Sequence, residues 1–543
     1  MSAVSSQCDW LESLILSDPE YGARRKRTRD AYRSIGVVGG GTAGFFAALA
    51  LRARLPHLKV TLIESSDIPI IGVGEATVPP IVAFLHGTLG IEIEEFYREV
   101  KPTWKQGIKF EWGLPGDYHF QAPFDWGLNS VGLLGSLQHR GDINGMTIQA
   151  LMMERGVTPV FKQKSGRYRS LLHRLPHAYH LDNVRLVRFL HKKALQAGVR
   201  YLDRKIVDAA LTPDGEEVDH LVTSAGERLS FDLYIDCSGF RSLLLEQKLR
   251  VPFISYADSL FTDRAVVFNA PHGGVLKPYT TAHTMKSGWT WNIPQVEDDH
   301  LGYVHASAFC SETQAEAEIR KRFPNASRSM RLVKFRSGRH AEAWKGNVIA
   351  IGNAYAFVEP LESTGLLMIT EAMEALVSMF PASKEDSASR KLFNSVSARL
   401  WDGLRWFLSI HYKFNRKVST PFWRAVRSDC DISGAQDLMG LVREHGPIHL
   451  IPRLSRRIRS SHIILFYGVS GFDCILLGQK VPVRLPASAE RTGAWHSRQR
   501  RIASLLKHAV PMREALEVVT ARPELLSQVL NDPASWLQEV REP

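Results

Sequence analysis

The stretch SIGVVGGGTAG at residues 34–44 decides the fold. Its first five residues form a short apolar run, which predicts a buried parallel strand. After the glycines, residues 43–55 are rich in Ala and Leu and favour a helix, and residues 60–63 form a second apolar run. Strand, very short turn, helix and strand together predict a β-α-β unit. We therefore expect an α/β protein with a core of the Rossmann type.

The glycine spacing predicts a dinucleotide site at this turn. Gly39, Gly41 and Gly44 form the pattern G-x-G-x-x-G. The first glycine makes the tight turn, the second lets the backbone approach a pyrophosphate, and the third lets helix and strand pack closely. The helix N-terminus directs its free N–H groups at the phosphates. Glu64 stands 20 residues after Gly44, where an acid accepts hydrogen bonds from a ribose. A glycine pattern alone also fits an ordinary tight turn, but here strand, helix and acid agree.

The next segments predict a helix and short strands. Asp182 is expected to cap a helix over residues 183–197, and Gly198 to end it. Strands follow at residues 200–202 and 207–211. This part of the chain therefore continues the α/β pattern.

Residues 260–310 contain several strand-like stretches, which predict a mixed sheet over a pocket: RAVVFNA, YTTAHTM, WTWNIP and YVHASAF. Residues 347–351 predict another buried strand and residues 365–379 a helix, and the sequence is mostly helical from about residue 385. We divide the chain into an N-terminal extension (1–33) with one short helix around residues 10–16, a core with an interleaved substrate-side sheet (34–385), and a mostly helical C-terminal region (386–543).

The composition is that of an ordinary globular protein, with 44% hydrophobic and 23% charged residues. No uncharged apolar run reaches the roughly 18 residues of a membrane span, so we expect no membrane partner. The first residues lack the basic start, apolar core and cleavage site of a signal peptide. The five cysteines are scattered and form no CxxC pair. This argues against a disulfide framework or a metal site and predicts a reducing cytoplasm.

The net charge of +12 leaves two interpretations of the basic run at residues 24–29. It is either a nucleic-acid arm or a solvated extension before the first strand. No nucleic-acid fold signature accompanies it, so we favour the extension and expect no nucleic-acid partner.

Several further motifs resemble one family. Residues 289–294 match the pattern W-x-W-x-I-P, although two tryptophans on a half-buried strand would alone indicate core packing. The other segments are IGVGEATVP at 71–79, FVEPLESTG at 357–365 and TPFWR at 420–424. Together they resemble the flavin-dependent tryptophan halogenases over roughly residues 34–440. The segments DLYIDCSGFRS (232–242) and NVIAIGNA (347–354) resemble flavin-contacting stretches of FAD-dependent monooxygenases, which favours FAD over NAD.

The resemblance implies the fold of aromatic hydroxylases and halogenases and a two-component reaction. FAD arrives as FADH2 from a separate NAD(P)H-dependent flavin reductase, and with O2 and chloride it generates HOCl. HOCl then travels through the protein to a second pocket. There a lysine hydrogen-bonds it or forms a chloramine, and the indole of a tryptophan or related substrate attacks. A homodimer is compatible with this resemblance.

By this resemblance Lys105, in KPTWKQGIKF, is the catalytic lysine. An ammonium at the end of a tunnel polarises HOCl toward Cl⁺, and partial burial readies the lysine pKa for exchange between forms. Most lysines are surface charges, which is the interpretation that suits Lys109. Glu362 matches the catalytic glutamate, which orients the lysine and takes the proton of the chlorinated ring. A carboxylate that complements a helix N-terminus is a second role compatible with the first.

The remaining site residues follow from the glycine turn and from the resemblance. Chloride is assigned to Thr364 and Gly365, at a helix N-terminus whose N–H groups suit an anion. The tryptophan motif is expected to keep the substrate from the flavin. The cofactor-binding residues are Gly39, Gly41, Thr42, Ala43, Gly44, Glu64, Ser65, Ile68, Glu75, Ala76, Gly352, Asn353, Leu361 and Leu366. The substrate-pocket residues are Phe124, Trp289, Trp291, Ile293 and Pro294.

Two segments depart from enzymes that act on free tryptophan. Those enzymes hold the indole with a His-x-Phe pair, whereas here Gln121 stands at the histidine position and Phe124 supplies the stacking ring. Residues 465–478 do not supply the aromatic and polar clamp for the amino acid. The residues that replace the clamp, or belong to the core, are Phe466, Tyr467 and Phe472. We therefore expect chlorination of a tryptophan within a peptide, or of another larger indole.

Three alternatives stay open from the sequence. The first is a halogenase of free tryptophan. The second is a single-component FAD monooxygenase, which would need neither Lys105, Glu362 nor the tryptophan motif. The third is a regulatory flavin protein with an unused site, against which Lys105 and Glu362 argue. No motif encodes the ring position or the choice between chloride and bromide.

Overall fold

The computed structural model describes residues 31–68, 74–125, 130–172, 174–451, 468–485 and 491–527. The helix expected around residues 10–16 and the basic run at 24–29 therefore lie outside the described residues. The same holds for residues 71–73 of the 71–79 segment and for Phe466 and Tyr467.

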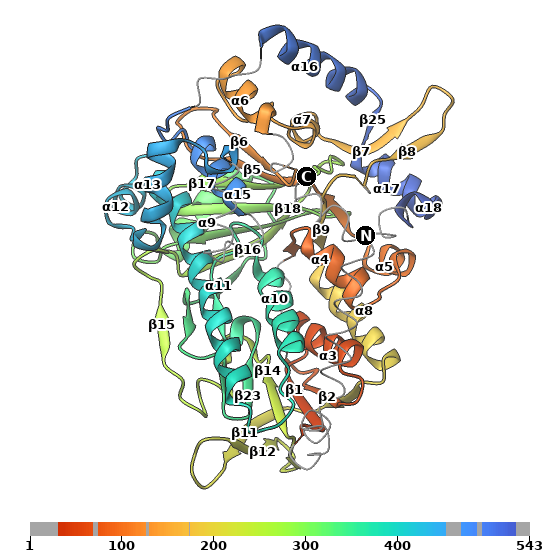
Figure 1. Ribbon diagram of the computed structural model, residues 1–543, viewed down its shortest axis with the longest axis vertical. Coiled ribbons are helices and arrows are strands. Elements are labelled where there is room, and N and C mark those ends of the chain that lie inside the picture. The colour runs from red at the N-terminus through yellow and green to blue at the C-terminus, as the bar shows by residue number, and fades with distance from the viewer. Residues whose placement is uncertain are drawn as a thin grey trace, which may run out of the picture.

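A six-stranded sheet forms the lower half of the molecule in Figure 1. Its order is β10 (Arg200–Asp203), β2 (Lys59–Glu64), β1 (Ser34–Val38), β14 (Leu233–Asp236), β23 (Val348–Ala350) and β22 (Trp344–Lys345). β1 pairs in parallel with both β2 and β14, so their carboxyl ends meet at one edge. The predicted β-α-β unit is confirmed, with β1 at its predicted bounds.

Three helices cover this sheet: α3 (Thr42–Arg54), α8 (Asn183–Gln196) and α10 (Gly365–Ser378). α3 is buried from Gly44 to Leu51 because it packs against both α8 and α10 as well as the sheet. Asp182 caps α8 by accepting a hydrogen bond from the Arg185 N–H at 2.8 Å, as predicted.

A seven-stranded mixed sheet lies in the upper half of Figure 1. Its order is β20 (Arg331–Lys334), β16 (Arg264–Ala270), β19 (Asp299–His305), β18 (Gly288–Pro294), β17 (Thr280–Met285), β5 (Gly107–Glu111) and β6 (Phe120–Pro123). β17 and β5 run parallel, and the other neighbours run antiparallel. All seven residues of β18 are buried. The mixed sheet expected from residues 260–310 is confirmed and is extended by β5 and β6.

A small sheet connects the two halves. β9 (Ala178–Leu181) lies between β3 (Glu75–Ala76) and β4 (Thr103–Lys105) and runs antiparallel to both. It thereby places the strand that carries Lys105 beside a segment predicted to bind the cofactor. The other strands form three small sheets: β11 (Ile206–Leu211), β12 (Val218–Thr223) and β13 (Arg228–Leu229); β15 (Phe253–Ser255), β21 (Gly338–His340) and β24 (Ala356–Phe357); β7 (Val157–Lys162), β8 (Tyr168–Ser170) and β25 (Ala509–Pro511).

Helices dominate after residue 386, as predicted. α11 (Ser387–Phe414) runs beside α10 and reaches from the six-stranded sheet toward the seven-stranded one (Figure 1). Asp386 caps it by accepting hydrogen bonds from the N–H groups of Ala388 and Ser389. The others are α12 (Pro421–Asp429), α13 (Gln436–His445), α15 (Gly468–Gly478), α16 (Thr492–Leu506), α17 (Met512–Ala521) and α18 (Glu524–Ser527).

Shorter helices cover the remaining faces: α4 (Pro80–Ala83), α5 (Ile93–Val100), α6 (Ser130–His139), α7 (Ile148–Arg155) and α9 (Glu312–Arg322). In the part of the chain that the structure describes, no helix combines the length and apolar character needed to cross a membrane.

Candidate active site

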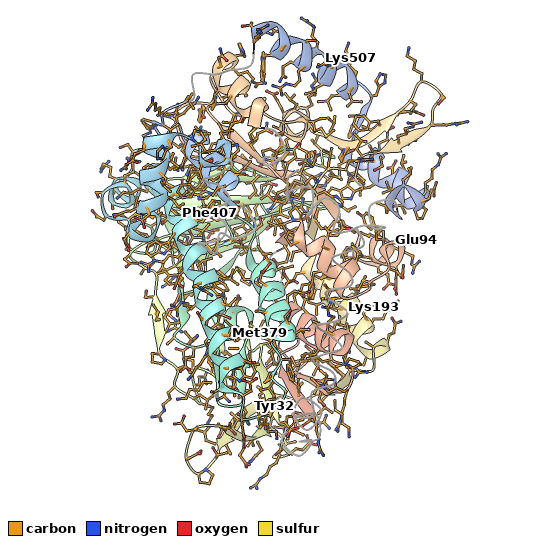
Figure 2. All side chains as sticks on the ribbon, in the orientation of Figure 1. Tyr32, Glu94, Lys193, Met379, Phe407 and Lys507 are labelled. Carbon is orange, nitrogen blue, oxygen red and sulfur yellow. The ribbon has the colours of Figure 1, made fainter. Side chains whose placement is uncertain are left out.

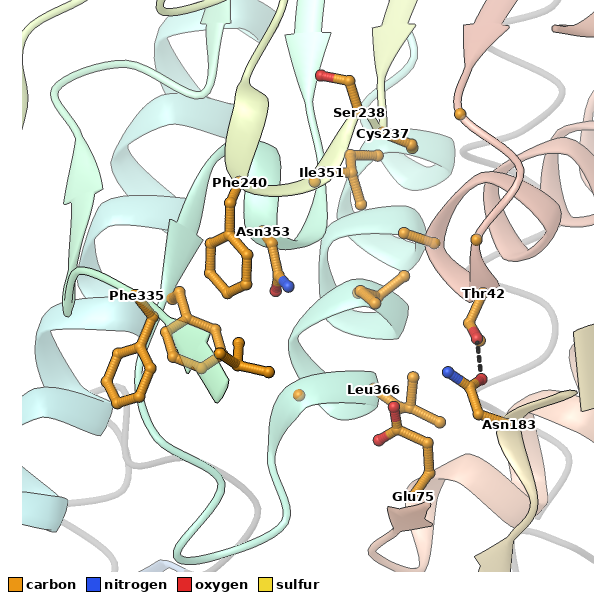
Figure 3. Close-up of a pocket in the computed structure, with 18 of the residues that line it drawn as sticks. Thr42, Glu75, Asn183, Cys237, Ser238, Phe240, Phe335, Ile351, Asn353 and Leu366 are labelled. Atoms are coloured by element: carbon orange, nitrogen blue, oxygen red, sulfur yellow. Dashed lines mark hydrogen bonds between the residues drawn. The ribbon is translucent and has the colours of Figure 1, made fainter. Parts of the chain in front are cut away.

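A cavity of about 400 Å³ lies between the carboxyl ends of β1, β2 and β14 and the seven-stranded sheet. Figure 3 shows Thr42 and Asn183 on one side of it and Phe240 and Phe335 on the other. The predicted cofactor-binding residues that line it are Gly39, Gly41, Thr42, Ala43, Glu64, Ser65, Ile68, Glu75, Ala76, Asn353 and Leu366. Gly44, Gly352 and Leu361 do not line it. The cavity therefore gathers most of one predicted site from segments that are far apart in the sequence.

The glycines of the turn have different structural roles. Gly39 has φ +121°, and a side chain there would overlap the carbonyl oxygen of Cys237. A side chain at Gly44 would overlap the carbonyl oxygen of Gly39, so this glycine lets α3 pack against β1. At Gly41 a side chain would meet no atom within 4 Å and would enter the cavity instead. Gly40, which the pattern did not include, is needed because Glu64 occupies the space of its side chain.

The polar groups around the cavity fit a dinucleotide. The glycine turn directs the N-terminus of α3 into the cavity, where N–H groups suit a pyrophosphate. Glu64 lines the cavity, and its Oε1 accepts a hydrogen bond from the Tyr201 hydroxyl at 2.8 Å. The Thr42 hydroxyl donates to Asn183 Oδ1 at 2.9 Å, which docks α8 on α3 (Figure 3). Burial raises the pKa of Glu75 to about 7, so near neutral pH its carboxyl group can also donate a hydrogen bond.

Ser363 joins this cavity to a second, buried group. Its side chain lines the cavity, and its Oγ accepts a hydrogen bond from Lys105 Nζ at 2.7 Å. Lys105 is fully buried on β4, and its Nζ lies 5.5 Å from the centre of the Phe124 ring. Burial lowers the pKa of Lys105 to about 7, although the charge of Glu362 acts in the opposite direction. The structure thus brings Lys105, Phe124 and Glu362 together next to the cavity.

Glu362 and Ser363 lie on a strained turn. Ser363 has φ +59°, a left-handed conformation that is rare for residues other than glycine. Glu362 is buried, and its Oε1 lies 2.6 Å from Nε2 of His411 on α11. Thr364 and Gly365 follow at the N-terminus of α10, where Gly365 lines the cavity and Thr364 is buried. The first N–H groups of α10 have no partner within the helix and fit an anion.

The tryptophan motif forms part of the wall. Trp291 and Ile293 of β18 line the cavity, whereas Trp289 and Pro294 do not. The Trp291 indole packs over Gly302 of β19, where a side chain would overlap the ring. Trp289 is buried with its ring centre 6.1 Å from that of Trp291. The motif therefore contributes to the hydrophobic core and also encloses the cavity.

The residues that mark the departures lie on two neighbouring elements. Gln121 is buried on β6, and its backbone N–H donates to Asn144 Oδ1. Phe472 is buried within the main hydrophobic core on α15, which contacts β6. Lys109 is half-buried on β5 and lines no part of the cavity.

Sequence reasoning missed Asn183, Ser363 and His411. Ser363 had a signal, because it lies between two predicted residues of one motif. Asn183 follows the predicted cap Asp182, but nothing local indicates that α8 docks on the glycine turn. His411 lies 49 residues after Glu362 within a long helical segment, where no spacing rule connects the two.

Comparisons with known proteins agree with this geometry. The tryptophan halogenase family profile matches residues 34–492. The crystal structure of MibH, a lathipeptide tryptophan 5-halogenase, has 50% sequence identity and a TM-score of 0.90, over 94% of this chain and 98% of MibH. The tryptophan 7-halogenase RebH of Lentzea aerocolonigenes is 33% identical over 469 residues, 81% of this chain and 88% of RebH. The 7-chloro-L-tryptophan 6-halogenase KtzR of Kutzneria sp. (strain 744) is 34% identical over 428 residues, 72% of this chain and 81% of KtzR.

The family resemblance and the α/β fold predicted from the sequence are both confirmed, since profile, relatives and solved structures agree across most of the chain. The protein is therefore an enzyme of the flavin-dependent tryptophan halogenase family.

Proposed function

We propose that this enzyme chlorinates the indole ring of a tryptophan held within a peptide or a larger indole compound. It uses FADH2 from a separate NAD(P)H-dependent reductase, together with O2 and chloride. The observation that carries this proposal is the hydrogen bond from the buried Lys105 amine to Ser363. One serine separates the amine from the cavity that fits FAD, so an oxidant formed in the cavity has a short path to the amine.

The glycine turn, Glu64 and the N-terminus of α3 would hold the pyrophosphate and ribose of FAD. When bound, the reduced flavin supplies the two electrons with which O2 and chloride yield HOCl. Trp291 and Ile293 enclose the cavity and exclude the substrate from it. Gly365 at the start of α10 offers N–H groups to chloride.

Lys105 receives HOCl in one of two protonation states. As an ammonium it donates a hydrogen bond to the oxygen of HOCl and increases the electrophilicity of the chlorine. As an amine its Nζ attacks the chlorine of HOCl and forms a chloramine. The Cl–O bond breaks as the N–Cl bond forms, and hydroxide leaves as water with a proton from the amine. A pKa of about 7 makes both states accessible near neutral pH. The phenyl ring of Phe124 lies beside the same nitrogen and offers an apolar face to an indole.

Glu362 completes the chemistry as the base for the ring. After chlorine adds to a ring carbon, the proton on that carbon must leave before aromaticity returns. Glu362 is buried and lies close enough to Lys105 to influence its pKa. The left-handed turn at Ser363 turns the two adjacent side chains to different partners, Lys105 and His411.

Two observations support a peptide-embedded tryptophan over the free amino acid. By the family resemblance, Gln121 stands at the position where free-tryptophan enzymes carry a stacking histidine. MibH is described as a lathipeptide tryptophan halogenase and shares 50% identity with this chain, against 33% for RebH. Higher identity to the peptide enzyme favours the larger substrate.

Mass spectrometry tests the proposal. The protein is supplied with a flavin reductase, FAD, NADH, O2 and chloride, and is offered free tryptophan beside a panel of tryptophan-containing peptides and other indoles. We expect the chlorine isotope pair on a peptide or larger indole, and its loss in Lys105→Ala. Chlorination of free tryptophan alone would replace the proposed substrate by the free amino acid. Hydroxylated product, or full turnover by Lys105→Ala, would contradict the proposed chemistry.

A further inference from the structure

We propose that His411 is the positioning residue of Glu362: it holds one carboxylate oxygen in place and carries the proton that the pair shares. This inference rests on the proposed function, in which Glu362 takes the proton of the chlorinated ring. His411 would act through Glu362 and would not touch the substrate.

The hydrogen bonds of the imidazole decide where its protons lie. Nδ1 lies 2.8 Å from the carbonyl oxygen of Phe407, one turn earlier on α11. A carbonyl oxygen only accepts hydrogen bonds, so Nδ1 carries a proton. Nε2 then faces Glu362 Oε1 at 2.6 Å, a short separation of the kind that a charge-assisted hydrogen bond produces. One proton lies between these two atoms, and the proposed role of Glu362 as a base requires that it lie on the imidazolium.

The imidazole ring has little freedom to move. The ring of Phe407 meets it edge to face at 5.0 Å between centres, and Phe110 of β5 packs at 5.5 Å. Figure 2 shows Phe407 on α11 near the seven-stranded sheet. The carbonyl group of His411 lies in the last turn of α11 and accepts a hydrogen bond from Trp112 Nε1 at 2.9 Å. The ring of His411 therefore packs against β5, and its backbone is held by Trp112, the residue directly after β5.

Charge balance gives the pair its importance. Both partners are buried, with 0% and 1% of their side chains exposed, so a carboxylate at Glu362 needs a nearby proton or cation. Lys105 of β4 is one such cation, but its pKa of about 7 and its proposed part in the reaction leave it without a constant charge. The Cys474 thiol of α15 also lies near this carboxylate. Its pKa is raised, chiefly by burial and secondly by the negative charge of Glu362. His411 is the neighbour whose proton can stay in place while Lys105 reacts.

An alternative role for His411 is structural. A buried histidine often forms hydrogen bonds with backbone groups near a helix end and packs in the hydrophobic core. The two roles separate in the shape of the pH profile. A carboxylate that loses a protonated neighbour in a buried site is harder to ionise. The acidic limb of the kcat profile must then move to higher pH, which loss of packing alone does not cause.

The experiment compares His411→Phe and His411→Gln with the wild type in the chlorination assay. We expect His411→Phe to lower kcat by about 10–100-fold and to move the acidic limb upward by about one pH unit, with KM and FAD affinity nearly unchanged. His411→Gln keeps a donor toward Oε1 and should recover much of kcat. His283→Gln is the matched control, because His283 Nδ1 and Glu111 Oε2 form a comparable pair at 2.8 Å outside the site. It should behave like the wild type.

Two further outcomes separate this inference from the proposed function. If Glu362→Gln is inactive while both His411 variants keep kcat and the pH profile, the inference is overturned and the proposed function stands. If Glu362→Gln chlorinates at the full rate, the proposed function fails first. Equal losses in both His411 variants with an unmoved acidic limb assign His411 to packing and also overturn the inference.

Discussion

Lys105, the proposed catalytic lysine, is a buried amine whose charge destabilises the folded protein. Its ordinary pKa of about 10.5 falls to about 7 in the folded protein, chiefly because burial removes water from the charged form. At about 1.4 kcal/mol per pKa unit, a pKa shift of this size destabilises the folded protein with a charged amine by several kcal/mol. The hydrogen bond to Ser363 returns only about 1 kcal/mol of this. The protein therefore keeps Lys105 at the expense of stability, as reactive groups in active sites often require.

The sign of this effect predicts a variant that is inactive but more stable. Below pH 7 the folded protein holds a charged, buried amine and the destabilisation is complete. Between pH 7 and 10.5 the folded protein has lost the proton that the unfolded chain still holds. The free-energy cost of removing this proton falls as the pH rises, so the destabilisation fades. Lys105→Met should raise Tm by about 1–3 °C at pH 6.5, less at pH 9, and abolish chlorination.

Differential scanning fluorimetry at the two pH values measures this change. Lys109→Met is the matched control, since Lys109 is half-buried on the next strand and its loss should alter Tm far less. A Lys105→Met variant that is less stable than the wild type at pH 6.5 would show that the amine is solvated or paired more effectively than its surroundings indicate.

At the scale of elements, the turn between β1 and α3 separates folding from cofactor binding. A methyl group at Gly44 would overlap the Gly39 carbonyl oxygen and push α3 away from β1. A methyl group at Gly41 would meet no protein atom and would enter the cavity. We expect Gly44→Ala to lower the Tm of the FAD-free protein by several degrees. Gly41→Ala should leave that Tm unchanged and weaken FAD binding by at least tenfold.

Thermal unfolding without FAD and titration of flavin fluorescence measure the two effects separately. Gly166→Ala, in an open turn with positive φ, is a control for the loss of glycine flexibility alone. Equal FAD affinity in Gly41→Ala and the wild type would mean that the pyrophosphate does not lie against this backbone.

The same turn shows what local sequence can predict. Glycine spacing, an apolar run and the cap Asp182 act within a few residues, so β1, α3, β2 and α8 were predictable almost to their bounds. Placement of the site needs pairings that no local signal encodes. β9 brings β4 beside β3, and Lys105 meets Ser363 across 258 residues. His411 reaches Glu362 only because α11 is long enough to extend to the seven-stranded sheet. The division of the chain at residues 33 and 385 stays a prediction.

At the scale of the whole molecule, the helix that follows the last described strand supports the strand of the proposed catalytic lysine. β25 pairs with β7, and the Thr158 hydroxyl donates to the Val510 carbonyl oxygen at 2.9 Å. α17 then packs against both α5 and β4. The residues that line the proposed cofactor cavity, by contrast, all lie between Val38 and Ile369. The described part of the C-terminal segment therefore supports the proposed chemistry of Lys105 without contributing to the cavity.

This arrangement predicts that removal of residues 508–543 separates FAD binding from chlorination. The shortened chain should bind FAD within about threefold of the wild-type affinity, because it keeps every residue of the cavity lining. It should chlorinate at least tenfold more slowly, because β4 loses the packing of α17 and Lys105 loses its fixed position next to Ser363.

Met512→Ala, which removes one buried side chain from α17, should show a weaker form of the same separation. Glu514→Gln keeps the packing and disturbs only the hydrogen bond from Tyr168 and the exposed ion pair with Lys162, so it should retain full activity. Flavin fluorescence and the mass-spectrometric assay give the two readings, and parallel loss of both in Met512→Ala would mean that the two halves of the molecule depend on each other for folding.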